Sequence, residues 1–138
     1  MDSQEEESFL DKAKKEVYLN KLNNNIDQDE IQTTLPNNSE TAKKVIKIAK
    51  DVAIHPRKKY KINGSIYTID EVIDRLSMLT TEHIKCVAFK LDHHKGVIQN
   101  RSGYVLSALF NITEHTQKQA KELLEYLIEK DKEKDEED

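Results

Sequence analysis

The side chains of this sequence that could take part in chemistry are mainly cationic, and they are unevenly distributed. Lysine and arginine on one surface are typical of proteins that contact phosphate groups. Lysines on the solvated backs of helices are equally ordinary, and the sequence leaves both interpretations open for the stretch 43–61. That stretch holds Asp51 as its one acidic residue, beside Lys43, Lys44, Lys47, Lys50, Arg57, Lys58, Lys59 and Lys61. A weaker basic group follows, made of Lys85, Lys90, Lys95 and Arg101.

The other reactive side chains form no catalytic pattern. Cys86 has no histidine or asparagine that the sequence ties to it, so we expect a buried structural thiol. Adjacent His93 and His94 would point about 100° apart on a helix, which favours surface residues over a metal site. We expect His83, near a helix start, to cap or pack. Because no nucleophile–base pair or ligand set can be recognised, we expect no enzyme, no metal and no cofactor.

The aromatic residues allow two interpretations. Rings beside lysine and arginine can stack on nucleic-acid bases. Rings at helical or strand spacing more often belong to a core. We expect Phe110 and Tyr67 in the core, and Tyr60 and Tyr104 remain open between the two roles.

Composition favours a helical domain without membrane contact. The chain has 138 residues, enough for one domain, and is 35% charged and 36% hydrophobic. Three glycines and two prolines are too few for a turn-rich β fold. No apolar run approaches the ~20 residues that cross a bilayer, and the acidic start is unlike a signal peptide. A single cysteine fits a reducing compartment, so we expect a cytoplasmic protein.

Hydrophobic periodicity predicts a mainly α fold, a compact domain of about six helices with one small β-hairpin. The helices are expected over residues 5–24, over a short stretch from Asp27 to Pro36, and over 39–54, 69–79, 81–91, 101–112 and 113–130. Thr68 and Glu71 form a capping box that begins one of these helices. His55-Pro56 ends another, since proline disfavours the α conformation before it.

The hairpin is the clearest local signal. Two short alternating runs, residues 59–62 and 65–68, flank Asn63-Gly64, a dipeptide that tolerates the positive φ angles of a tight type I′ turn. An isolated hairpin is marginally stable, so this one must pack on helices. We expect its apolar residues to make that contact: Tyr60, Ile62, Ile66 and Tyr67.

Several stretches resemble the DnaD-like C-terminal domain of the replication initiator A proteins of Gram-positive plasmids and integrative elements. The similar stretches are YLNKLNNNID, YKINGSIYTIDEVIDRLSML, TTEHIKCVAFKL and IQNRSGYVLSALFN. The resemblance has two specific parts. One is His83-Ile84 followed by Val87, and the other begins at Ile98 and includes Asn100, Arg101, Tyr104, Leu106, Leu109, Phe110 and Asn111. Tyr104, Ala108 and Ile112 stand where the DnaD family proper has Tyr, an apolar residue and Trp, so the tryptophan is missing here.

The resemblance implies an accessory domain of a plasmid or mobile-element replication initiator. Such a domain would bind DNA with little sequence preference, or connect the initiator to host helicase-loading proteins. It would cover residues 17–112, with an acidic helix or extension at 1–16, a C-terminal helix at 113–130 and a disordered charged tail at 131–138. The residues ahead of residue 17 leave no room for the winged helix of the family, so we expect a fragment, a stand-alone version or a diverged relative.

Phosphate contacts are the mechanism we expect at this stage. Cations that neutralise phosphates release counterions and bind without specifying sequence. The residues expected to bind nucleic acid are Arg57, Lys58, Lys59, Lys61, Arg101 and Tyr104.

A protein–protein adaptor or homodimerising module that never touches nucleic acid is the alternative. The net charge of −4, the acidic ends and an apolar helical stripe favour it. That stripe consists of Leu123, Leu124, Leu127 and Ile128. It could equally pack on the domain's own core.

Overall fold

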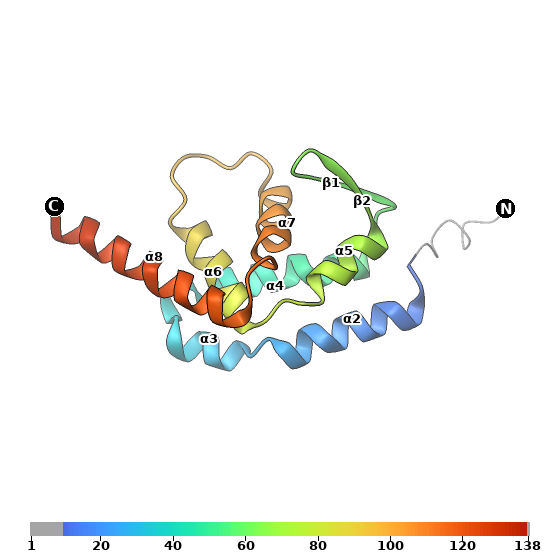
Figure 1. Cartoon of the computed structure of the whole chain (residues 1–138), viewed down its shortest axis with the longest axis horizontal. Helices are drawn as coiled ribbons and strands as arrows, with labels where there is room; N and C mark the ends of the chain where they lie inside the picture. Colours follow the sequence, from blue (N-terminus) through green and yellow to red (C-terminus); the bar gives the residue numbers. More distant parts are fainter. Residues whose placement is uncertain (1–9, 138) are drawn as a thin grey trace.

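Helices in this chain begin and end where the sequence has capping and breaking signals. The structure is a computed structural model that describes residues 10–137, and it confirms the mainly α fold with one small hairpin. The elements in chain order are α2 (Lys12–Asn25), α3 (Gln28–Thr34), the 3-10 helix η1 (Pro36–Asn38), α4 (Ser39–Ile54), β1 (Lys59–Ile62), β2 (Ser65–Thr68), α5 (Ile69–Leu76), α6 (Thr81–Asp92), α7 (Arg101–Ile112) and α8 (Gln117–Glu137) (Figure 1).

Side-chain caps explain several of these helix starts. The Asp27 carboxylate accepts a hydrogen bond from the Glu30 amide at 3.1 Å, which begins α3. Thr68 and Glu71 form the predicted capping box of α5, with hydrogen bonds of 3.2 and 3.0 Å. Ser39 begins α4 after η1, and Ile54 ends it before His55-Pro56, as predicted.

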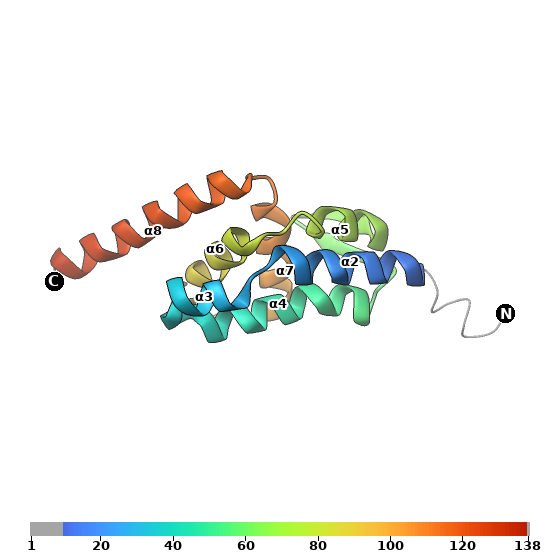
Figure 2. The same cartoon turned by 90° about the horizontal axis from the view of Figure 1, so that it is seen from below.

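Helix α6 is the central element. It packs against α3, α4, α7 and α8, and every residue from Thr81 to Phe89 is buried. Figures 1 and 2 show α8 leaving the body of the molecule at one end. A helix that is covered on all sides needs neighbours to satisfy its polar groups. The Asp92 carboxylate at its end accepts hydrogen bonds from Asn38 and Thr41, both at 2.6 Å.

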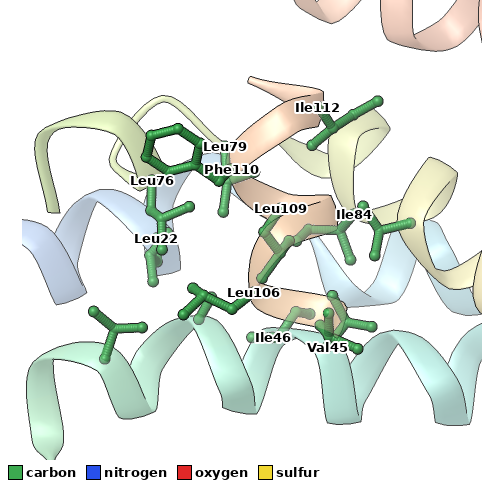
Figure 3. Close-up of a cluster of buried hydrophobic side chains, with 14 of the residues drawn as sticks. Leu22, Val45, Ile46, Leu76, Leu79, Ile84, Leu106, Leu109, Phe110 and Ile112 are labelled. Atoms are coloured by element: carbon green, nitrogen blue, oxygen red, sulfur yellow. The ribbon is translucent and has the colours of Figure 1, made fainter. Parts of the chain in front are cut away.

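The core is a continuous cluster to which α2 and α4 to α8 all contribute. Figure 3 shows its central part, where side chains of α7 lie between α4, α5 and α6. Its labelled members are Leu22, Val45, Ile46, Leu76, Leu79, Ile84, Leu106, Leu109, Phe110 and Ile112. The Tyr18 hydroxyl donates to the Ala49 carbonyl at 2.6 Å and fastens α2 to α4. Leucine, isoleucine and valine at helical spacing account for this packing.

The hairpin has the predicted turn and register. Asn63 has φ 55° and Gly64 φ 82°, the two positive angles of a type I′ turn. The prediction that all four apolar hairpin residues contact helices is wrong for Ile66, which is 60% exposed. Ile66 pairs with Lys61, so the two side chains share the outward face. Tyr60 and Ile62 are buried, and Tyr67 is half-buried.

The two ends of the chain differ from the sequence expectations. The expected helix over residues 5–24 appears as α2 from Lys12, and its first residues lie outside the part of the chain that the structure describes. The sequence predicts disorder for residues 131–138, whereas α8 continues to Glu137. Glutamate and lysine are good helix formers, and pairs such as Lys132 and Glu129, 3.7 Å apart, favour continuation.

Candidate nucleic-acid interface

The outer face of the hairpin carries two of the predicted cations. Lys59 and Lys61 alternate along β1 with Tyr60 and Ile62, which are 3% and 1% exposed. Successive strand residues point to opposite faces. Both lysines therefore project into solvent from a strand whose other face is held in the core.

The hairpin is fastened to α7, which fixes where its outer face lies. The Asn63 amide at the turn donates to the Asn111 side-chain oxygen at 2.6 Å. The Tyr67 ring lies 4.7 Å from the Phe110 ring, in the tilted arrangement that aromatic pairs favour. In Figure 1 the hairpin and the loop between α6 and α7 project on the same side of the molecule.

Arg57 and Lys58 lie in the segment that joins α4 to β1. The Arg57 guanidinium lies over the Tyr60 ring, 4.8 Å from its centroid, and its backbone N–H donates to the Tyr60 hydroxyl at 2.9 Å. This cation–π contact holds an exposed arginine in one position. Tyr60, left open between core and surface by the sequence, is thus a core residue that supports a surface cation.

Arg101 and Tyr104 lie on α7, but only part of this pair joins the hairpin cations. Arg101 is the exposed first residue of the helix, and its neighbour Ser102 lies in a recess with Arg57. Tyr104 is 36% exposed and packs edge-on against His94, with ring centroids 5.1 Å apart. It lines a different groove, of about 340 Å³, between α6 and α7. Tyr104 therefore faces away from the Arg57 side of the helix.

The basic residues of this region fall into two groups, those of α4 and those of the hairpin, its approach and the start of α7. On α4, Lys43 pairs with Glu40 at 3.0 Å and Lys47 with Asp51 at 4.0 Å, while Lys44 and Lys50 have no ion pair among the described side chains. Among the side chains described between residues 10 and 134, no ion pair involves the predicted cations of the hairpin, its approach or the start of α7. These are Arg57, Lys58, Lys59, Lys61 and Arg101. The second group is therefore available for an external anion.

The reactive side chains away from this face have structural roles. The Cys86 thiol donates to the Ala120 carbonyl at 2.9 Å, and burial raises its pKa to about 11. His83 accepts from the Thr80 amide at 3.0 Å and donates through Nε2 to the His115 carbonyl at 2.7 Å. The predictions of a buried thiol and a capping histidine are confirmed.

Among the described residues, no group of three or more His, Cys, Asp or Glu side chains could hold a metal ion. No helix there is long and apolar enough to cross a membrane.

Two features of this surface were missed from the sequence. The exposure of Ile66 beside the lysines follows from the Asn-Gly turn, because a two-residue loop pairs Ile62 with Ser65 and hence Lys61 with Ile66. That signal was present in the sequence. The recess beside Arg57 joins α4, β1 and α7, and the sequence holds no local signal for such a meeting.

The fold and this surface define a small helical domain with a cationic hairpin. Residues 5–127 match DUF6017, described as a family of unknown function, and the chain belongs to that family. No curated protein and no solved structure shows significant similarity to the chain.

Proposed function

We propose that this domain binds the phosphate backbone of DNA through the outer face of its hairpin. The observation that carries this function is the pair Lys59 and Lys61, side by side on β1 and without acidic partners among the described side chains. Arg57, which lies against the Tyr60 ring, and Lys58 add two exposed cations just before β1. Ammonium groups attract phosphates without reading bases, so the binding is weak and non-specific.

The cellular setting we propose is replication initiation of a plasmid or mobile element. In that setting the domain is the accessory part of an initiator and meets host helicase-loading proteins in the cytoplasm. Support for the setting comes from the DnaD-like resemblance, whereas support for phosphate binding comes from the hairpin itself.

Salt dependence and charge reversal test the proposed DNA binding. Anisotropy of a labelled duplex should report binding at about 50 mM salt that weakens strongly by about 200 mM. The double variant Lys59→Glu/Lys61→Glu should bind at least ~10-fold more weakly, with a log–log salt slope smaller by about 1.8, since each phosphate contact contributes about 0.9.

A charge-matched control uses two exposed lysines on α8. Lys118→Glu/Lys121→Glu changes net charge equally but lies far along the chain from the hairpin. We expect it to retain near wild-type affinity. Absence of binding at low salt, or equal losses in both double variants, would remove the proposed DNA binding.

A second candidate function is self-association or adaptor binding through α8. Leu123, Leu127 and Ile128 are only half-buried against the body, and Tyr126 is 58% exposed. Light scattering across a concentration series separates self-association from binding of a different partner. A monomer at all concentrations removes self-association, and a dimer that dissociates on Leu127→Lys supports it.

A further inference from the structure

A recess beside Arg57 combines an apolar floor with a polar edge. It lies between the second half of α4, β1 and the first turns of α7, and encloses about 170 Å³. Val52 and Leu106 are buried and Ile48 is half-buried, whereas His55, Arg57 and Ser102 are exposed. Pockets with mostly apolar walls and a few placed polar groups are the usual form of small-molecule binding sites.

The cation at the edge of this recess is positioned rather than free. Tyr60, which also lines the recess, holds the Arg57 guanidinium by ring contact and by a hydrogen bond to its backbone. Asp51, the acidic residue that lines the recess, pairs with Lys47 at 4.0 Å and forms no ion pair with Arg57. The guanidinium can therefore meet an anion at the mouth of the recess.

The start of α7 adds a second positive influence. Ser102 lies in the first turn of this helix, where unpaired N–H groups carry partial positive charge. Asn100 caps one of them by accepting from the Gly103 amide at 3.0 Å. An anion at the mouth would thus lie between the guanidinium and a helix start.

We infer that the recess receives one unstacked base of single-stranded DNA, with the adjoining phosphate at Arg57. The inference rests on the proposed phosphate binding and names the form of DNA that the domain prefers. A base is planar with apolar faces and polar edges, and within a strand its nucleoside is joined to phosphates, which matches a floor of aliphatic side chains edged by polar groups and a cation. Paired bases are stacked inside a duplex and cannot enter. The volume suits a single ring, below the ~300–1,000 Å³ of drug-sized sites.

Three ligands separate base binding from phosphate binding. They are oligo(dT) of about 15 nucleotides, an abasic oligonucleotide of the same length, and a duplex. Stacking of a base on an aromatic side chain changes affinity by roughly 5- to 150-fold, and the lower end applies to a recess whose floor is mainly aliphatic. We therefore expect wild type to bind oligo(dT) at least ~5-fold more tightly than the abasic strand.

Filling the recess is the direct test. Ser102→Trp places a large ring there from an exposed position in a first helical turn, without cutting the core. Gln117→Trp is the matched control, an uncharged exposed residue at the start of α8. Ser102→Trp should lower oligo(dT) affinity to that of the abasic strand and leave abasic binding unchanged, while Gln117→Trp changes neither. Ser102→Leu, a smaller filling, gives the same test if thermal melting shows the tryptophan variant unfolded.

The outcomes distinguish this inference from the proposed phosphate binding on which it rests. Equal binding of oligo(dT) and the abasic strand, or unchanged oligo(dT) binding in the filled variants, overturns base binding in the recess and leaves the proposed phosphate binding intact. Higher oligo(dT) affinity in Ser102→Trp also overturns it, because a base would then stack on the new ring instead of entering. Failure of all three ligands to bind overturns both proposals.

Discussion

Cys86 and His83 are two residues of α6 that attach this helix to the C-terminal part of the chain. The Cys86 thiol reaches the Ala120 carbonyl of α8, and the His83 imidazole reaches the His115 carbonyl of the loop before α8. The sequence indicated that both are structural, from the lack of partners in one case and the position near a helix start in the other. It could not indicate which carbonyl each one meets, because those acceptors lie more than thirty residues away.

We expect ionisation of Cys86 to destabilise the protein at alkaline pH. Burial raises its pKa from 9.0 to about 11. The unfolded chain therefore loses the thiol proton first, so the stabilisation is complete below pH 9 and is lost as pH rises through 11. The full effect is about 3 kcal/mol, at ~1.4 kcal/mol per pKa unit.

Urea unfolding of wild type and Cys86→Ala from neutral pH to about pH 11 measures this effect. The difference between the two free energies of unfolding isolates the thiol, since all other titrating groups are shared. The advantage of wild type should shrink as pH rises. A constant difference would show that the thiol keeps its ordinary pKa when folded.

His83 lends itself to a graded substitution. His83→Gln can still accept from the Thr80 amide, as glutamine does in capping boxes, but gives up the His115 carbonyl. His83→Ala loses both bonds. We expect losses of about 1 and about 2 kcal/mol in the free energy of unfolding at neutral pH. Equal stability of the two variants would mean that the hydrogen bond from the Thr80 amide contributes nothing.

The hairpin shows how much of an element the sequence can determine. Its two strands, turn and register were all predictable, because Asn63-Gly64 permits a two-residue loop and fixes the pairing. The misplaced Ile66 came from treating hydrophobic residues as inward whatever their register. Strand alternation decides the face, and hydrophobic character alone does not.

The turn glycine offers a test of this element. Gly64 has φ 82°, and a Cβ there would meet nothing within 4 Å, so Gly64→Ala imposes conformational strain without a clash. We expect a loss of about 1–2 kcal/mol in the free energy of unfolding. Ser65→Ala, next along an exposed strand, should change stability by less than ~0.5 kcal/mol. Equal effects would argue against a positive φ angle at Gly64.

Across the whole molecule, composition and periodicity predicted the helical class but not how its surfaces meet. The cations of the hairpin and its approach are close in sequence and exposed. Arg57 and Tyr104 were both predicted to contact nucleic acid, and they line different recesses of the molecule. Which side of a helix faces which neighbour depends on packing between distant elements, and α6, α7 and the hairpin settle it only in three dimensions.

Helix α8 supplies a prediction at this scale. Leu124 of α8 is buried against the rest of the domain. Further along α8, the Asp131 carboxylate lies 3.3 Å from the His93 imidazole, and this is the last described polar contact between α8 and the rest of the domain. Leu124→Ala should cost about 2–5 kcal/mol. Ending the chain after Asp131 should change the free energy of unfolding by less than ~0.5 kcal/mol. Thermal and urea unfolding measure both, and a large loss on truncation would place stabilising contacts in the final turns.

The division of the hairpin into a packed and a solvated face has an evolutionary consequence. Lys59, Lys61 and Ile66 contribute almost nothing to the core, so replacing them alters the outer face of the hairpin at little cost to folding. Thr68 shares this face but caps α5, so its replacement would destabilise that helix. Substitutions at the first three positions are therefore expected to change what the domain can touch. One scaffold can in this way acquire new partners before any of its helices has to change.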